Sequence, residues 1–302
     1  FQAEDGIRDS VASRGLGDVY KRQVFLICSP KRIEILLPMD EVCIVSMLNT
    51  EFNLEGKTAL VTGASSGLGA HFCKVLAERG AKEVVTGRRD DKIKNVASEI
   101  RKNKGEAISI PLDVTDNNSI KWCFDKVENT YGVVDIVSNN AGVAKPEKAL
   151  SVDEESWDKV IDTNLKGVWL VSTEAARRMI LKKVNGSIVN TSSIQGLRVA
   201  MDRASYAASK AAVIQLTKAL ALEWSEHKIR VNALCPGFFF TEMTENYFTS
   251  PKFSKYLSSL VPKRIGNMDE ITAPFLLLAS NAGSYVNGIS IPVDGGHSLG
   301  KM

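Results

Sequence analysis

Short runs of β-branched residues alternate with segments of helical periodicity from Lys57 to the end of the chain. Strand–helix alternation is typical of βαβ units, whose right-handed crossovers build a parallel sheet with helices on both faces. Seven runs are expected to form strands, at residues 59–62, 83–86, 107–110, 134–138, 187–191, 230–234 and 290–293. The pattern therefore predicts an α/β protein with a doubly wound, three-layer fold and a seven-stranded parallel sheet.

Two helices are indicated by local signals. Residues 67–79 carry apolar side chains at helical spacing, which form one stripe that can cover a sheet face: Leu68, Phe72, Val75 and Leu76. Farther along, Ser151 and Glu154 have the spacing of a capping box, which predicts a helix that begins there and runs towards Asn164.

The first 46 residues are expected to lie outside the fold. They show neither helical nor strand periodicity. Residues 2–9 and 13–23 match in-frame translations of sequencing-library adaptors, so residues 1–23 are interpreted as an assembly artefact. Met47 is the expected natural start and Met39 the alternative. Residues 47–302 are then expected to form a single α/β domain.

The composition is that of a globular protein, with 44% hydrophobic and 24% charged residues. The net charge is +3, and no stretch combines clustered basic residues with aromatic ones, so no nucleic-acid partner is expected. No apolar run approaches the roughly 20 residues of a membrane span, so no membrane partner is expected. Five cysteines without paired spacing and three scattered histidines predict reduced thiols, no metal site and a cytoplasmic protein.

A glycine-rich turn, Thr62-Gly-Ala-Ser-Ser-Gly-Leu-Gly69, follows the first expected strand and opens the first expected helix. At this place a parallel sheet presents backbone N–H groups and a helix N-terminus to a pyrophosphate. Gly63 permits the tight turn, Gly67 allows a phosphate to approach, and Gly69 allows helix and strand to pack closely. A plain turn remains the alternative for such a cluster taken alone.

Tyr206 and Lys210 stand four residues apart on a strongly helical stretch, and therefore on one face of the helix. A nearby cation lowers the pKa of a tyrosine and brings the phenol towards useful acid strength. Taken alone, the pair is far more typical of an amphipathic helix with a core tyrosine and a surface lysine.

Further motifs accompany these two: Asn139-Asn140-Ala141-Gly142, Asn164, Ser193 and Pro236-Gly237. In their order and spacing, from about Asn53 to the end, the chain resembles the short, non-extended branch of the short-chain dehydrogenase/reductase family. The resemblance implies a Rossmann fold and an NAD(P)(H)-dependent oxidoreductase that interconverts a secondary alcohol and a ketone. Among the two adjacent serines, the family's thirteen-residue separation from the tyrosine selects Ser193 over Ser192.

The resemblance also implies the role of each catalytic residue. Ser193 would hydrogen-bond the substrate oxygen, and Tyr206 would donate or accept its proton. Lys210 would lower the pKa of the tyrosine and bind the nicotinamide ribose. Asn164 would help to hold a water through which protons reach solvent.

A larger set of residues is implied to contact the cofactor: Gly63, Ser65, Ser66, Gly67, Leu68, Gly69, Asp113, Val114, Asn140, Ala141, Gly142, Tyr206, Lys210, Pro236, Gly237 and Thr241. For Asn139, a structural tie between neighbouring strands is at least as good an explanation. At the end of the second strand, where NAD enzymes usually carry an acid, stand Gly87 and then Arg88 and Arg89. Arginines suit a 2′-phosphate, so NADP(H) is favoured, with NAD(H) the alternative.

The substrate is a small-molecule carbonyl or alcohol, and the variable segment after Gly237 is expected to select it. Seven aromatic residues between that turn and Leu260 predict a lid with an apolar inner face, although more than half of them are assigned to core or subunit contacts. Resemblance to 3-oxoacyl carrier-protein reductases and to sugar-acid dehydrogenases is equal. An inactive dinucleotide-binding regulatory or scaffold protein is the competing hypothesis. Because members of the family usually form dimers of dimers, the resemblance also implies a homotetramer.

Overall fold

The computed structural model describes residues 50–242, 248, 253, 256–258 and 262–299. The chain divides into two compact units, residues Phe1–Glu51 and Phe52–Met302. The prediction that residues 1–46 stand outside the fold, and the choice between Met47 and Met39, lie outside the described residues. The second unit carries the whole sheet and is the subject below.

The sheet contains seven parallel strands, as predicted: β1 (Thr58–Val61), β2 (Lys82–Gly87), β3 (Glu106–Pro111), β4 (Ile136–Asn139), β5 (Gly186–Thr191), β6 (Ile229–Pro236) and β7 (Ser290–Val293). Each lies within two residues of its expected bounds. The order across the sheet is β3-β2-β1-β4-β5-β6-β7, and every neighbouring pair is parallel. The fold is therefore the predicted Rossmann type.

The direction of winding reverses beside β1, which pairs with β2 on one side and β4 on the other. At such a switch point the loops after the two flanking strands diverge to opposite faces, which opens a crevice at the carboxyl ends of the strands. The position of the expected glycine-rich turn, directly after β1, is thus the position where a ligand crevice forms.

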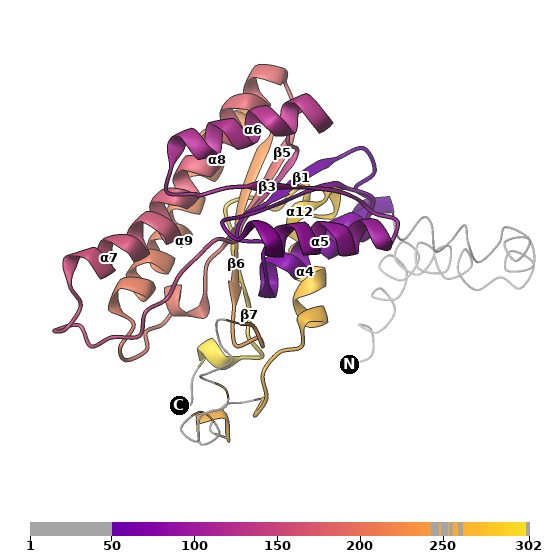
Figure 1. Ribbon diagram of the computed structural model, residues 1–302. Coiled ribbons are helices and arrows are strands. Elements are labelled where there is room, and N and C mark those ends of the chain that lie inside the picture. Colours follow the sequence, from indigo (N-terminus) through magenta and orange to yellow (C-terminus); the bar gives the residue numbers. More distant parts are fainter. Residues whose placement is uncertain (1–49, 243–247, 249–252, 254–255, 259–261, 300–302) are drawn as a thin grey trace, which may run out of the picture. The chain divides into compact units, whose positions relative to one another are not determined.

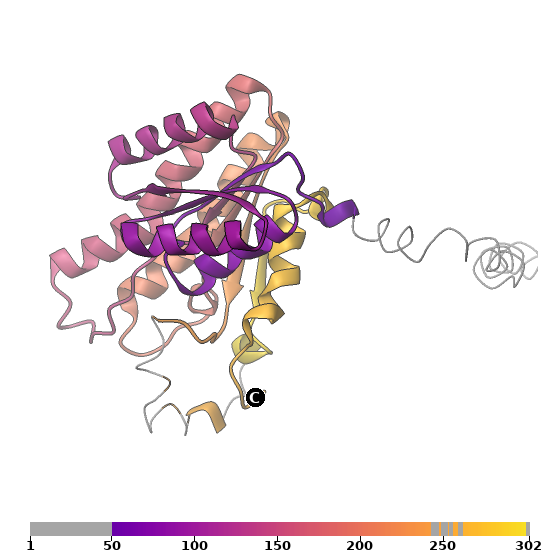
Figure 2. The same cartoon turned by 45° about the vertical axis from the view of Figure 1, so that its right-hand side comes forward.

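Helices cover both faces of the sheet (Figures 1 and 2). On one face lie α4 (Gly67–Glu78), α5 (Asp90–Lys102) and α12 (Thr272–Ala279), and on the other α6 (Asn117–Tyr131), α8 (Gly167–Lys182) and α9 (Ala204–Trp224). The first core is centred on Phe72 of α4, stacked on Phe275 of α12 with ring centroids 4.0 Å apart. The second contains Phe124 and Met179, both fully buried.

The predicted stripe on α4 faces the core: Phe72, Val75 and Leu76 are buried and Leu68 is partly buried. The predicted cap of the later helix is wrong. Helix α7 (Glu154–Ile161) is capped by Asp153, whose side chain accepts a hydrogen bond from the Ser156 N–H at 2.7 Å. A carboxylate is a strong N-cap acceptor, and its charge also complements the helix dipole, so Asp153 rather than Ser151 is the N-cap.

A one-turn distortion, η2 (Asp162–Lys166), joins α7 to α8 with π-type hydrogen bonding. Such bulges are frequent at functional sites because they turn side chains out of the ordinary helical register. This bulge carries Asn164 in its centre.

None of the described helices is both long enough and apolar enough to cross a membrane. Within the same residues no group of three or more His, Cys, Asp or Glu side chains could hold a metal ion. Three of the five cysteines are described, and all three are buried free thiols: Cys73, Cys123 and Cys235.

Candidate active site

A cleft of about 450 Å³ opens at the carboxyl ends of the strands. Its lining includes nearly all of the residues singled out from the sequence: Gly63, Ser65, Ser66, Gly67, Leu68, Arg88, Arg89, Asp113, Val114, Asn140, Ala141, Gly142, Ser193, Tyr206, Lys210, Pro236, Gly237 and Thr241. Two others, Gly69 and Asn164, lie behind this lining. The loops that follow six different strands, together with α9, thus bring segments far apart in sequence to one site.

The sequence did not single out several other lining residues: Leu112, Val143, Thr163, Thr191 and Glu242. Most of them directly adjoin a predicted residue or end a strand. Their position at strand ends was the available signal, because side chains there point to the same edge of a parallel sheet.

The turn after β1 requires glycine for two different reasons. Gly63 has a φ of +63°, and a Cβ there would lie 2.7 Å from the Ala141 Cα. A Cβ on Gly69 would lie 2.4 Å from the Gly63 carbonyl oxygen and 2.5 Å from the Asn140 side-chain nitrogen. Gly69 therefore allows the first turn of α4 to close onto the loop beneath it, while Gly63 provides the backbone conformation.

Thr62 and Asn140 tie this turn to the loop after β4. The Thr62 hydroxyl accepts hydrogen bonds from the backbone N–H groups of Asn140 and Ala141, each at 3.0 Å. The Asn140 amide donates in return to the carbonyls of Thr62 and Gly63, each at 3.2 Å. Both loops at the switch point are thereby held in one arrangement. Asn139 is a strand tie: its amide donates to Asn190 of β5 and to Ser172 of α8.

Lys210 is almost fully buried, with 3% of its surface exposed. Its ammonium group donates to the Thr191 carbonyl at 2.8 Å and lies 5.7 Å from the centre of the Tyr206 ring. Burial lowers the pKa of Lys210 to about 8. This lysine is therefore held in place by the end of β5 and is easily discharged at mildly alkaline pH.

Tyr206 is half-buried at the start of α9. Burial raises the pKa of its phenol, an effect that the hydrogen bond with Ser193 and the charge of Arg203 only partly offset. The net shift is upward because desolvation of the phenol outweighs this hydrogen bond and this charge, and the expected lowering of the pKa by Lys210 stays a prediction.

The two adjacent serines face different partners. The Ser192 hydroxyl donates to the Lys210 carbonyl at 2.8 Å and so anchors α9 to β5. The Ser193 hydroxyl accepts from the Gln195 N–H at 3.1 Å and also hydrogen-bonds Tyr206. Of the two serines, Ser193 is thus the one that is paired with the tyrosine.

Asn164 uses its side-chain amide to hold the loop after β4. Its oxygen accepts from the Val143 N–H at 2.8 Å, and its nitrogen donates to the Val143 carbonyl at 2.9 Å and to the Ser209 hydroxyl at 3.2 Å. The side chain is fully buried. In this structure it orients backbone next to Gly142, whose added Cβ would lie 3.6 Å from the Lys210 ammonium.

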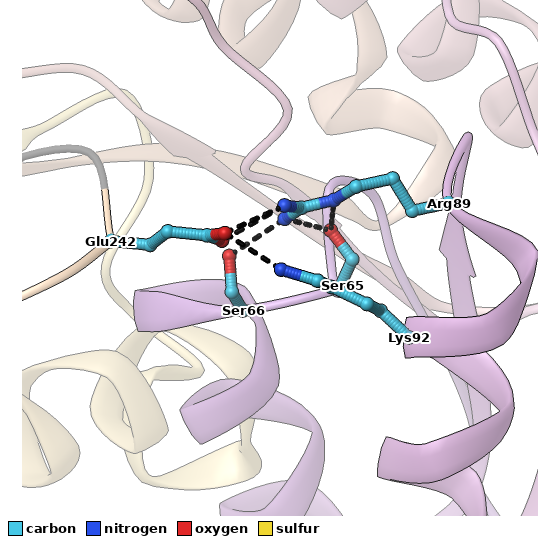
Figure 3. A network of polar contacts seen from close by, with 5 residues as sticks. All are labelled: Ser65, Ser66, Arg89, Lys92 and Glu242. Atoms are coloured by element: carbon cyan, nitrogen blue, oxygen red, sulfur yellow. Dashed lines mark hydrogen bonds and ion pairs between the residues drawn. The ribbon is translucent and has the colours of Figure 1, made fainter.

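The opposite end of the cleft carries the charged side chains (Figure 3). Arg89 donates to the hydroxyls of Ser65 and Ser66 and, through NH1, to both carboxylate oxygens of Glu242 at 3.0 and 2.9 Å. Lys92 donates to the same carboxylate at 2.6 Å. These hydrogen bonds lower the pKa of Glu242 to about 2. The sequence did not single out Lys92 as a site residue, although it lies one helical turn beyond Arg89.

Asp113 lines the cleft after β3, and its carboxylate accepts from the backbone N–H and hydroxyl of Thr115 at 2.9 and 2.8 Å. Burial alone would raise the pKa of Asp113, but these hydrogen bonds and the charge of Arg88 lower it. The loop after β3 therefore presents an ionised carboxylate close to the arginines that follow β2.

The aromatic segment after Gly237 packs largely on itself. The Phe238 ring contacts the rings of Phe248, Phe253, Tyr256 and His297 with centroids 5.0 to 6.0 Å apart. Of the six aromatic residues that the structure describes here, only Phe239 lines the cleft, and the seventh, Tyr247, lies outside the described residues. Packing accounts for most of the aromatic enrichment that the sequence shows here.

The strand order, with a glycine turn at the switch point, defines a dinucleotide-binding α/β protein. The family model for short chain dehydrogenases matches residues 57–252. A 3-oxoacyl-(acyl-carrier-protein) reductase of Chlamydia muridarum is 38% identical over 244 residues, which cover 80% of this chain and 98% of the relative. A gluconate 5-dehydrogenase of Gluconobacter oxydans is 36% identical over 246 residues, 81% of this chain and 96% of the relative.

Among solved structures, a gluconate 5-dehydrogenase from Burkholderia cenocepacia, in complex with NADP and tartrate, superimposes with a TM-score of 0.81. It is 32% identical in sequence, and the match covers 84% of this chain and all of that one. The chain therefore belongs to the short-chain dehydrogenase/reductase family and is an NAD(P)-dependent oxidoreductase.

Proposed function

We propose that this oxidoreductase interconverts a secondary alcohol and a ketone, with Tyr206 as the general acid and base. The observation that carries the proposal is the pairing of Tyr206 with Ser193 beside the buried Lys210, in the same cleft as the glycine turn. A nicotinamide dinucleotide, when bound, supplies or takes up the hydride. The protein supplies orientation and proton transfer.

The residues of the cleft fit such a dinucleotide. Side chains at Gly63 or Gly67 would narrow the cleft, since each added Cβ would approach another part of the lining to 3.1 Å or less. A Cβ at Gly142 would lie 3.6 Å from the Lys210 ammonium. The backbone N–H groups of the turn would hold the pyrophosphate. Asp113 and Val114 would contact adenine, and Pro236 and Gly237 would cover the nicotinamide.

In the direction of ketone reduction, the Ser193 and Tyr206 hydroxyls would both donate to the substrate oxygen. Burial keeps the phenol protonated at neutral pH, which suits it to donate as the oxygen gains negative charge. The Lys210 ammonium would then stabilise the phenolate left on Tyr206, and it would also bind the nicotinamide ribose.

Asn164 is proposed as a positioning residue. Its side-chain amide is hydrogen-bonded to Val143 and Ser209. The side chain would therefore act by holding the loop at Gly142 and Val143 next to the Lys210 ammonium. The water-holding role that the family resemblance implied for Asn164 stays a prediction beside it.

NADP(H) is proposed as the preferred cofactor, with NAD(H) the alternative. Support comes from Arg88 and Arg89, which line the cleft directly after β2, and from the absence of an acid at Gly87. Two guanidinium groups there would bind a 2′-phosphate with charge-assisted hydrogen bonds. The solved relative from Burkholderia cenocepacia contains NADP.

The substrate is proposed to be a 3-oxoacyl thioester or a sugar acid, the substrate classes named for the two relatives described above. A panel that contains both classes, measured with NADPH and NADH, separates them. The competing hypothesis is a scaffold protein that binds dinucleotide without turnover.

The decisive experiment compares wild type with Tyr206→Phe. The variant is expected to lose at least about a thousandfold in kcat because the proton donor is gone, while its NADPH affinity stays within about twofold. Unchanged turnover in the variant would refute the assignment of Tyr206. A wild-type protein that binds NADPH but oxidises and reduces nothing in the panel would favour the scaffold hypothesis.

We also infer a homotetramer in the cytoplasm. Support comes from large apolar side chains that are exposed on α7, α8 and α9, where the family associates: Trp157, Trp169, Leu181 and Leu222, with 39 to 79% of their surfaces exposed. Exposed apolar patches of this kind mark protein–protein contacts. Analytical ultracentrifugation that shows only monomer at micromolar concentration would refute the assembly.

A further inference from the structure

The charged end of the cleft contains an anion that belongs to the protein itself. The Glu242 carboxylate lies where the starts of α4 and α5 meet, bound by Arg89 through both oxygens and by Lys92 through one (Figure 3). Ser65 and Ser66 line the same end of the cleft, and their hydroxyls accept hydrogen bonds from the same Arg89 guanidinium. One carboxylate thus engages the cationic donors that a phosphate group would use.

This ion pair joins two parts of the cleft that are far apart in the sequence. Glu242 comes from the loop after β6, 153 residues from Arg89, and both residues line the cleft. Both carboxylate oxygens accept from the same Arg89 nitrogen, Nη1, and a phosphate oxygen accepts charge-assisted hydrogen bonds from the same kind of donor. Because the donors are the same, a phosphate and this carboxylate cannot both be fully bound.

We propose that Glu242 is a specificity-determining residue that competes, as an internal anion, with the 2′-phosphate of the cofactor for Arg89 and Lys92. Binding of a 2′-phosphate displaces the carboxylate into solvent, whereas a ligand without this phosphate leaves it in place. Glu242 therefore lowers the preference for phosphorylated over unphosphorylated dinucleotide. The proposal rests on the proposed cofactor site, and it deepens the account of how that site discriminates.

The charge balance supports this direction of effect. With Glu242 ionised, the pair of cations carries one net positive charge toward the cleft, and without it two. The attraction of a phosphate dianion rises with that net charge, while an unphosphorylated ribose gains little. The hydrogen bonds keep Glu242 ionised throughout the neutral range, because they lower its pKa to about 2.

The test uses Glu242→Gln in the full chain, with adenosine 2′,5′-bisphosphate and adenosine 5′-monophosphate as probes in isothermal titration calorimetry. The Kd of the bisphosphate is expected to fall about fivefold, the change that one exposed ion pair makes, while the Kd of the monophosphate changes less than about twofold. The same ratio is expected for NADPH against NADH. At higher salt the difference should shrink.

Glu99→Gln is the matched control. Glu99 lies on α5 and is exposed, as Glu242 is, but it pairs with Lys74 and is no part of the cleft lining, so the same loss of charge should leave both Kd values unchanged. The melting temperature of both variants shows whether the fold is intact.

Equal changes for the two probes, or weaker binding of the bisphosphate, would overturn the proposal; the second result would mean that Glu242 orders the cations rather than competes for them. Wild type without any preference for the bisphosphate would contradict the proposed NADP(H) preference, yet a preference gained in Glu242→Gln would still support the competition. The probes need no turnover, so an inactive protein would refute the proposed reaction and leave this test unaffected.

Discussion

Glu83 is a carboxyl group inside the hydrophobic core. It is the second residue of β2, none of its surface is exposed, and its cross-strand neighbours Ala59 and Ala107 leave room for the longer side chain. In the described part of the chain its two carboxyl oxygens have no hydrogen-bond partner of standard geometry. The Cys73 thiol on α4 is the polar group that faces it. Burial raises the pKa of Glu83 well above its usual range, so the folded protein keeps this group protonated at pH values at which the unfolded chain has already lost the proton.

This burial should make stability fall as the pH rises. In the unfolded chain Glu83 loses its proton near pH ~4.3, whereas the folded chain keeps it to a much higher pH. Between those two pKa values the folded state binds one more proton, so the free energy of unfolding decreases by about 1.4 kcal/mol per pH unit. Stability is therefore fully present below the unfolded pKa and is lost as the pH rises through the folded one.

Glu83→Gln removes this titration while it keeps the shape of the side chain. We expect the free energy of unfolding of the variant to exceed that of wild type by an amount that grows by up to about 3 kcal/mol between pH 6 and pH 8. Urea unfolding at each pH, at one fixed protein concentration because of the proposed assembly, measures the difference. Titration of all other groups cancels in this comparison.

The control is Glu106→Gln on the adjacent strand β3, where the side chain is exposed. It removes one negative charge without changing the core, and its difference from wild type should not grow with pH. A difference between Glu83→Gln and wild type that is the same at every pH would refute the reasoning, because it would mean that the folded protein ionises Glu83 as readily as the unfolded chain does.

Two further predictions concern cations. Because burial lowers the pKa of Lys210 to about 8, its ammonium is lost above that pH, and NADPH affinity should fall there in wild type but not in Lys210→Met, as fluorescence titration would show. Affinity that stays constant to pH 10 in wild type would contradict a binding role for the ammonium. Arg178 on α8 joins three carboxylates, including Asp125 of α6 and the buried Glu174, so Arg178→Ala should lower the free energy of unfolding by about 2 kcal/mol in urea. The neighbouring Arg177→Ala, which is exposed, should lower it by less than about 0.5 kcal/mol, and equal losses would show that burial does not govern these pairs.

Much of the fold follows from local pattern. Hydrophobic periodicity along the chain indicates which face of each element is buried. The seven strands and the stripe on α4 could therefore be predicted from the sequence. A glycine that a turn requires is also a local signal, since the backbone at Gly63 is left-handed and glycine adopts that conformation readily. The residues that end strands then share one edge of the sheet, because parallel strands place all their carboxyl ends together. The sequence alone therefore determines the architecture and the edge at which the cleft forms.

Only the tertiary structure decides which partner each polar side chain takes. The sequence singles out Asn164, but the hydrogen bonds between its side chain and the Val143 backbone depend on how a helical bulge meets a distant loop. It marks Arg89 as a phosphate ligand, but the carboxylate on that arginine comes from a loop 153 residues away. It gives Tyr206 a lysine neighbour, yet burial by the surrounding fold sets the direction of the pKa shift. Hydrogen bonds and desolvation act through space over a few ångströms, and sequence pattern records only neighbours along the chain.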